Sequence, residues 1–543
     1  MIRIENGSLE FLLGNNFIRR TGEKLEKHVY AIIIFALSAV SILAFLVFYQ
    51  NGLGLAYNDA RSHLDIARRV VEGLKPGLAQ LGSVWLPLPH ALMIPFIWND
   101  FLWHSGLAGA LVSMVSYVGT GLLVYQFLKN LGVGYLGRLV GVFVFAFNLN
   151  ILYLQSTAMT ELLLIFTMTA GVYELVMWHV SDKIFRLVKA AFWIALSTLV
   201  RYDGWFLLIW AGLLILYHVY KKKGYKAAEG NLIFFSTLAA FGAVLWFLWN
   251  LAIFKDPLYF AFGPYSAHAQ QEQLLEAGNL ATKGNLWLST KMYFYALFYN
   301  TGALPLVLGA IGAVFFWAND KIKESVKIGS SALMAPLAFN ILALYLGFSV
   351  LFIQGISGNT WFNVRYGVMM MPTVAILVGY LVDRLRDFRW VIVGLLLFVT
   401  FFSFTSVDAV TIDDARVGSS QKNVSEVSGW LKANAKDERG FVLISAASHD
   451  AIIFSSGLPM KRFIHEGTGA YWESATGGPE HWARWIIVRT YDDNDQVYKL
   501  IKNTVGFKNN YNKVQSFPFA DIYEIKPEFL DRLNYEPIFG RQK

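Results

Sequence analysis

Five charged residues lie at the ends of long apolar segments, where an ionisable side chain of a membrane protein is a candidate for function. They are Asp59, Glu161, Arg201, Asp203 and Arg365. A carboxylate held at a membrane surface is able to accept the proton of an attacking hydroxyl. A guanidinium binds phosphate through parallel hydrogen bonds and stays charged. These residue types indicate a general base at Asp59 and a phosphate-binding group at Arg365, with Arg201 second.

Each of these residues also has a purely structural interpretation. Asp59 suits the start of a helix, where a carboxylate caps free backbone N–H groups, and Glu161 suits a helix N-terminus in the same way. Arg201 and Asp203 suit an ion pair within a tight turn. Arg365 suits an arginine that reaches to lipid headgroups. The residue types alone leave both sets of roles open.

Histidines and tyrosines near these charges extend the candidate site. His63 follows Asp59 by one helical turn, a spacing at which Asp and His are able to share a metal, so a divalent cation is a candidate cofactor. His90 ends a segment with two prolines, which also suits a structural role. The candidates for binding the acceptor or a cation are Glu161, His63, His90 and His268. The residues expected to support the site are Asp203, Tyr366 and Tyr265.

The composition is that of an integral membrane protein. The 543 residues are 55% hydrophobic and only 15% charged, whereas soluble domains carry about 25% charged residues. The absence of cysteine excludes disulfides and cysteine nucleophiles. The net charge of +8 is explained by Lys and Arg beside membrane spans and does not require a nucleic-acid partner.

Apolar runs predict about eleven membrane-spanning helices, preceded by a polar N-terminal segment, 1–28, in the cytoplasm. The predicted spans are 29–49, 105–127, 137–155, 160–179, 187–200, 204–220, 231–254, 291–317, 333–354, 366–382 and 389–406. Lys and Arg gather in alternate loops, which places those loops in the cytoplasm. The five charged residues and the outer segments 50–104 and 255–290 then share the opposite side. A polar segment as long as 255–290 is typical of a lid or binding loop.

The segment Tyr57–Gly73 predicts an amphipathic helix on the outer leaflet, because Leu64, Ala67 and Val71 recur at helical spacing. Its arginines are expected in solvent or beside lipid phosphates. They are Arg61, Arg68 and Arg69.

After residue 410 the long apolar runs stop. Three short apolar stretches predict strands: 441–445, 485–488 and 521–525. Helical patterns at 424–433 and 495–502 alternate with them. The sequence therefore predicts a membrane domain over 29–410 and an extracytoplasmic α/β domain over 411–543.

The order of these motifs resembles the GT-C superfamily of membrane glycosyltransferases, most nearly the protein O-mannosyltransferase and aminoarabinose-transferase type. The similar elements are Asn58-Asp59-Ala60 in the first outer segment, Thr160-Glu161, Arg201-Tyr202-Asp203, and Arg365-Tyr366 followed by Pro372. The relatives often have Asp-Glu at the first motif and His-Pro-Pro where this chain has Trp85-Leu-Pro-Leu-Pro-His90. The Trp-Trp-Asp motif of oligosaccharyltransferases is absent, which argues against transfer to asparagine.

The resemblance implies an inverting glycosyltransferase of the plasma membrane. It would move a hexose or pentose from a polyprenyl-phosphate (dolichyl-phosphate in some relatives) to a hydroxyl of a protein, glycan or lipid. In that reaction Asp59 is the expected base, and Arg365 and Arg201 are the expected ligands of the donor phosphate. The alternative is a transporter or flippase of lipid-linked sugars, which would also have many spans and intramembrane charges.

Overall fold

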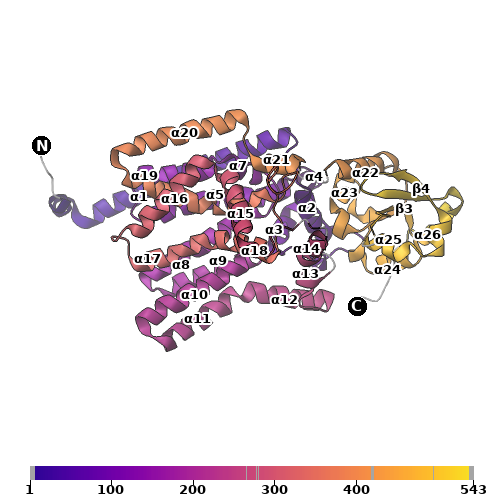
Figure 1. Ribbon diagram of the computed structural model, residues 1–543, viewed down its shortest axis with the longest axis horizontal. Helices are drawn as coiled ribbons and strands as arrows, with labels where there is room; N and C mark the ends of the chain where they lie inside the picture. Colours follow the sequence, from indigo (N-terminus) through magenta and orange to yellow (C-terminus); the bar gives the residue numbers. More distant parts are fainter. Residues whose placement is uncertain are drawn as a thin grey trace.

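The computed structural model describes residues 6–538 except 264–265, 277, 279, 418–420, 493–494 and 537. It consists of a helical bundle and a smaller domain at one end of the bundle, built from the C-terminal part of the chain (Figure 1). The long helices of the bundle run roughly along the long axis of the molecule, and short helices lie between the bundle and the small domain (Figure 1).

Each of the eleven apolar segments contains helix. Seven stretches are long and apolar enough to cross a membrane, or nine if each of two bent helix pairs is one span, within the described residues. The bent pairs are α11 (Tyr225–Ala239) with α12 (Phe241–Phe254), and α15 (Leu286–Thr301) with α16 (Ala303–Ala318). The other two predicted segments are shorter: α6 (Tyr135–Ala146) has 12 residues and α9 (Ile184–Thr198) has 15.

The remaining helices of the bundle have the following bounds. They are α1 (Asn6–Gln50), α5 (Leu107–Asn130), α7 (Leu149–Leu154), α8 (Glu161–Ser181), α10 (Asp203–Lys223), α13 (Tyr259–Phe262), α14 (Ala267–Glu276), α17 (Glu324–Ser330), α18 (Ala335–Leu346), α19 (Met371–Arg384), α20 (Arg389–Ser406) and α21 (Val410–Val417), with 3-10 turns η2 (Ser331–Met334), η3 (Val364–Met370) and η4 (Arg386–Phe388).

The bend between α15 and α16 measures 112°. Gly302 lies at this break with φ +80°, in the left-handed region that glycine adopts without strain. The chain resumes as α16 in the next residue. One apolar run of the sequence thus becomes two helices of different direction.

The segment after α1 forms short elements between the bundle and the small domain: α2 (Asn58–Val71), η1 (Leu78–Leu81), α3 (Leu88–Ile97) and α4 (Asp100–His104). The predicted amphipathic helix is therefore present as α2. Part of its charged face is not in solvent, because α23 (Ala446–Ser456) of the small domain packs against it. Arg68 and Arg69 are each 8% exposed, so the expectation of solvated arginines is wrong for these two residues.

Specific ion pairs compensate the buried arginines of α2. Arg69 Nη1 bonds Asp450 of α23, and Arg68 Nη2 lies 2.6 Å from Asp100 Oδ1 of α4. The buried Asp65 accepts a hydrogen bond of 3.1 Å from Trp103 Nε1. The pair of Arg69 and Asp450 thus joins the outer segment to the small domain, and the other two contacts join α2 to α4.

The small domain holds a five-stranded sheet in the order β2-β1-β3-β5-β4. Strand β1 (Phe441–Leu443) runs parallel to β2 (Phe463–Ile464) and β3 (Ala483–Val488), while β5 (Asp521–Ile525) runs antiparallel to β3 and β4 (Tyr511–Ser516). The helices are α22 (Gln421–Asn434), α23, α24 (Ala470–Gly477), α25 (Gln496–Ile501) and α26 (Val505–Asn510), with 3-10 turns η5 (Met460–Arg462), η6 (Glu466–Thr468), η7 (Pro479–His481) and η8 (Pro527–Arg532). The predicted strands and helices are confirmed, whereas β2 and β4 lack an apolar pattern long enough to predict.

Candidate active site

Arg365 lies at the centre of a buried charged cluster. It belongs to η3 at the start of the 364–384 span, and its guanidinium contacts three carboxylates. Its Nη2 lies 2.7 Å from Asp59 Oδ2 and its Nε lies 3.0 Å from Glu161 Oε1. The third carboxylate, Asp414 Oδ2 of α21, is 3.7 Å from Nη1. Side chains from four separate parts of the chain therefore meet at one guanidinium.

Arg201 extends the cluster on the far side of Glu161. Its Nη1 lies 3.5 Å from Glu161 Oε1, and its Nε lies 3.4 Å from Asp203 Oδ2. The same Nη1 is 3.4 Å from Thr160 Oγ1. Glu161 thus shares one carboxylate oxygen between two guanidinium groups. We call the six residues the charged cluster: Asp59, Glu161, Arg201, Asp203, Arg365 and Asp414.

Two tyrosine rings border the arginines. The guanidinium of Arg365 lies 4.9 Å from the ring centre of Tyr57 and 5.4 Å from that of Tyr366, and Arg201 lies 4.9 Å from Tyr366. A cation over an aromatic face is stabilised by the ring quadrupole. The Tyr57 hydroxyl lies within hydrogen-bond distance of two acceptors, Asp414 Oδ2 at 3.1 Å and the Thr411 carbonyl at 2.9 Å. Tyr57 thereby fixes α21 beside the cluster.

Close backbone contacts position Arg365. A Cβ at Gly367 would lie 2.3 Å from the Ala296 carbonyl oxygen, so only glycine lets η3 pack this tightly on α15. The Asn300 amide of α15 donates to the Val364 carbonyl at 2.7 Å. These contacts hold the backbone on both sides of Arg365 and fix where its side chain enters the cluster.

The carboxylates of the cluster differ in access to solvent. The Asp59 side chain is 41% exposed, whereas those of Glu161, Asp203 and Asp414 are 0%, 4% and 3% exposed. Glu161 Oε2 has no hydrogen-bond partner among the described residues. Of these four carboxylates, Asp59 is therefore the one that an incoming hydroxyl group reaches without rearrangement of the fold.

His63 and His90 form a buried pair beside the cluster. Nδ1 of His63 lies 2.8 Å from Nε2 of His90, and the Trp85 ring lies 4.3 Å from the His63 ring. Burial, together with the positive charges of Arg201 and Arg365, lowers the pKa of His63 to about 3. Burial also lowers the pKa of His90 well below its ordinary value. Both rings are neutral in the folded protein at neutral pH.

We expect the folded protein to lose stability as the pH falls below about 6.5 because of this pair. The folded pKa of His63 is about 3, and the ordinary value is about 6.5. Between these two pKa values the unfolded chain binds more protons than the folded protein. The free energy of unfolding therefore decreases as the pH falls. At pH 5 the effect amounts to about 2 kcal/mol for one such histidine. It is measured as the unfolding midpoint of purified protein at pH 7.5 and pH 5.0.

His63→Gln should flatten this pH dependence, and the matched variant His481→Gln should leave it unchanged, because the His481 side chain is 61% exposed. An equal drop of the midpoint in all three proteins would contradict the assignment to His63.

The structure brings together most of the predicted site residues. Asp59, Glu161, Arg201, Asp203, Arg365 and Tyr366 lie in the cluster or on it, and His63 and His90 lie next to it. His268 of α14 contacts Glu272 and Phe262, with no contact to the cluster among the described residues. The remaining prediction, Tyr265, lies outside the described residues.

Asp414 and Tyr57 were missed by sequence reasoning. Asp414 lies after the last apolar segment, in the part of the chain assigned to the C-terminal domain. Tyr57 is one of 26 tyrosines, and nothing in the local sequence distinguishes it from the others. The local signal that could have indicated Asp414 is the acidic pair Asp413-Asp414, which follows shortly after the predicted span 389–406.

A divalent cation has no preformed site of three or more His, Cys, Asp or Glu ligands within the described residues. The position between Asp59 and Glu161 holds the guanidinium of Arg365. A metal at this position would have to displace that side chain.

No protein-family model matches the chain, and no curated protein matches it. Among solved structures, ArnT from Cupriavidus metallidurans bound to undecaprenyl phosphate is similar, with a TM-score of 0.54 and 11% identity over 90% of this chain and 98% of ArnT. Apo ArnT gives a TM-score of 0.53 with the same identity and coverage.

The oligosaccharyltransferase of Archaeoglobus fulgidus in complex with Zn and sulfate has a TM-score of 0.48, with 12% identity over 89% of this chain and 71% of that one. ArnT is an aminoarabinose transferase with the GT-C fold, and its alignment spans both the helical bundle and the small domain. The chain is therefore a multi-pass membrane protein with the fold of the GT-C membrane glycosyltransferases.

Proposed function

We propose that the protein is an inverting glycosyltransferase that moves a sugar from a polyprenyl-phosphate donor to an acceptor hydroxyl at the outer face of the membrane. The observation that carries the proposal is the charged cluster in a GT-C fold. In it the partly exposed carboxylate of Asp59 lies beside the buried guanidinium of Arg365, at the start of the 364–384 span. The undecaprenyl phosphate bound to ArnT supports a polyprenyl-phosphate donor.

The proposed reaction needs one proton acceptor and one stabiliser of negative charge. The acceptor oxygen attacks the anomeric carbon while the bond from that carbon to the phosphate oxygen breaks. The bonding pair leaves with the lipid phosphate, and the acceptor proton passes to the Asp59 carboxylate. The phosphate gains negative charge during this step, which a nearby guanidinium stabilises.

The charge of the cluster sets the order of events in this proposal. Four carboxylates share two guanidinium groups, so the cluster carries a formal excess of negative charge. If all contacts within the cluster stayed as they are, its negative charge would repel the phosphate of an approaching donor. We propose that Arg365 exchanges Asp59 for a phosphate oxygen when the donor enters, which frees Asp59 for the acceptor hydroxyl. Glu161 keeps the guanidinium in place during the exchange.

We infer the side of the membrane from the distribution of Lys and Arg. Basic residues gather in the connections after α10 and after α16, which lie at the end of the bundle away from α2 (Figure 1). The N-terminus and these loops are then cytoplasmic, and the cluster and the small domain face the exterior of the plasma membrane. ATP and nucleotide sugars are not supplied there, which favours a lipid-linked donor.

The proposal is tested by incubating the purified protein with a panel of polyprenyl-phosphate sugars and a crude acceptor extract, and measuring free polyprenyl phosphate. We expect release from one donor and a new glycosidic bond on the acceptor. Release that stops on chelation and returns with one divalent ion would add a metal to the mechanism. No release from any donor would contradict a transferase, and flipping of labelled lipid-linked sugars in liposomes would then test transport.

A further inference from the structure

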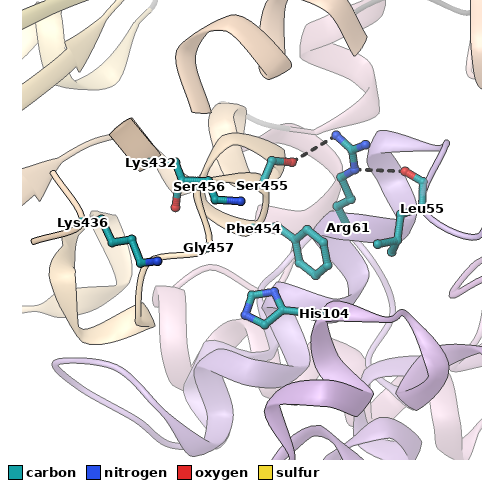
Figure 2. Close-up of a pocket in the computed structure, with 9 residues that line it drawn as sticks. All are labelled: Leu55, Arg61, His104, Lys432, Lys436, Phe454, Ser455, Ser456 and Gly457. Carbon is teal, nitrogen blue, oxygen red and sulfur yellow. Dashed lines mark hydrogen bonds between the residues drawn. The ribbon is translucent and has the colours of Figure 1, made fainter. Parts of the chain in front are cut away.

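A cavity of about 470 Å³ lies where α2, α4 and the small domain meet. Figure 2 shows Arg61 across from Lys432 and Lys436, with Phe454 and His104 between them. The volume is within the range of small-ligand sites. The nine described residues that line it include these three cations and no Asp or Glu.

Arg61 is not neutralised inside this cavity. Its Nε donates to the Leu55 carbonyl at 3.0 Å and its Nη1 donates to Ser455 Oγ at 3.1 Å, and both acceptors are uncharged (Figure 2). No ion pair joins Arg61 to a carboxylate among the described residues, in contrast to Arg68 and Arg69 on the same helix. Burial lowers the pKa of Arg61, and no carboxylate among the described residues pairs with it to offset this effect. An anion would supply the missing charge.

The cavity is separate from the charged cluster. Successive residues of an α-helix turn by about 100°, so Arg61 lies nearly opposite Asp59 on α2. Asp59 points toward Arg365, whereas Arg61 points toward Ser455 of α23. A ligand of this cavity is therefore a different molecule, or a different part of a molecule, from the reacting end of the donor.

Exposed aromatic residues lie close to the rim of the cavity. His104 ends α4, whose Phe101 is 61% exposed, and Trp98 just before α4 is 65% exposed. The Phe101 ring contacts Tyr49 near the end of α1 at a ring separation of 6.5 Å. Exposed aromatic residues at the end of a span mark the level of the lipid headgroups. A headgroup phosphate is the anion available at this depth.

We propose that this cavity binds the phosphate of an anionic phospholipid headgroup from the outer leaflet. Arg61 offers planar, paired donors for phosphate oxygens, and Lys432 and Lys436 of the small domain add charge from the other wall. A phosphate between them would join α2 to the small domain. The site therefore links the position of this domain to the membrane surface.

The test is a titration of the full-length protein in nonionic detergent with dioctanoyl phosphatidylglycerol, followed by native mass spectrometry. We expect saturable binding of one lipid and much weaker binding of dioctanoyl phosphatidylcholine, whose choline cation is repelled by the cavity. The double variant Arg61→Gln/Lys432→Gln should bind phosphatidylglycerol at least about tenfold more weakly. Lys432→Gln/Lys436→Gln, which changes only exposed side chains, should show the same direction.

The matched control is Lys499→Gln/Lys508→Gln, which removes two exposed positive charges elsewhere on the small domain and should bind as the wild type does. Equal affinity of the cavity variants and this control would overturn the proposal. Binding of inorganic phosphate as tight as that of the lipid would overturn it in favour of a soluble phosphate ligand. The titration contains no donor or acceptor, so its result is independent of the sugar-transfer assay.

Discussion

Asp59→Asn is expected to lower the turnover of sugar transfer by about 10²–10⁴-fold, the usual contribution of a positioned base. The amide keeps the size of the carboxylate but does not accept the proton of the attacking hydroxyl. The fold should persist, because the Asp59 side chain is 41% exposed and Arg365 retains its contacts with Glu161 and Asp414. Turnover is measured as release of polyprenyl phosphate with acceptor present, and donor affinity by titration.

Asp256→Asn is the matched control for this variant. Asp256 lies in the predicted outer segment, is exposed, and accepts a hydrogen bond of 2.8 Å from the Leu258 N–H, which an asparagine side chain also accepts. It should transfer sugar at the wild-type rate. Near-wild-type turnover of Asp59→Asn, with the control also active, would remove Asp59 from the role of base.

Arg365→Gln is expected to be destabilising as well as inactive. The guanidinium compensates the fully buried Glu161, and removal of one partner of a buried ion pair typically costs about 3–5 kcal/mol because the other charge stays buried. Glu161→Gln in the same chain should recover part of this loss, since no uncompensated carboxylate then remains at that position. Stability is measured as the unfolding midpoint of the single and double variants in detergent.

Transfer activity should not recover in the double variant, because the charge that stabilises the leaving phosphate is still missing. Loss of one such group typically costs about 10²–10³-fold in turnover. The matched control is the same cycle on Lys221 and Glu324, a pair 2.7 Å apart with side chains 55% and 64% exposed, where little coupling is expected. Additive effects in the Arg365 and Glu161 cycle would contradict a direct interaction between them.

Local patterns in the sequence were sufficient for the class of the protein and for most of its helices. An apolar run long enough to cross a membrane leaves the chain few choices other than helix, because every backbone N–H and C=O group must bond within the segment. The same argument failed to give the direction of each helix. The run at 291–317 breaks at Gly302 and turns by 112°, since a glycine inside an apolar run does not reveal the conformation it adopts.

The burial of the arginines on α2 depended on a partner distant in sequence. The pattern of Tyr57–Gly73 gives an amphipathic helix correctly but does not say what covers its polar face. In the structure α23 covers it, and Asp450 compensates Arg69 across 381 residues of sequence.

The sequence by itself determined a multi-pass membrane chain, a C-terminal α/β domain and five charged residues at span ends. These follow from hydropathy and alternation, which are read within a single segment. The tertiary structure alone decided which charges meet. Asp59 and Arg365 are 306 residues apart, and Tyr57 and Asp414 are 357 apart. The reason is that a guanidinium is satisfied by whichever carboxylates the packed helices bring within about 4 Å, and sequence spacing carries no record of that distance.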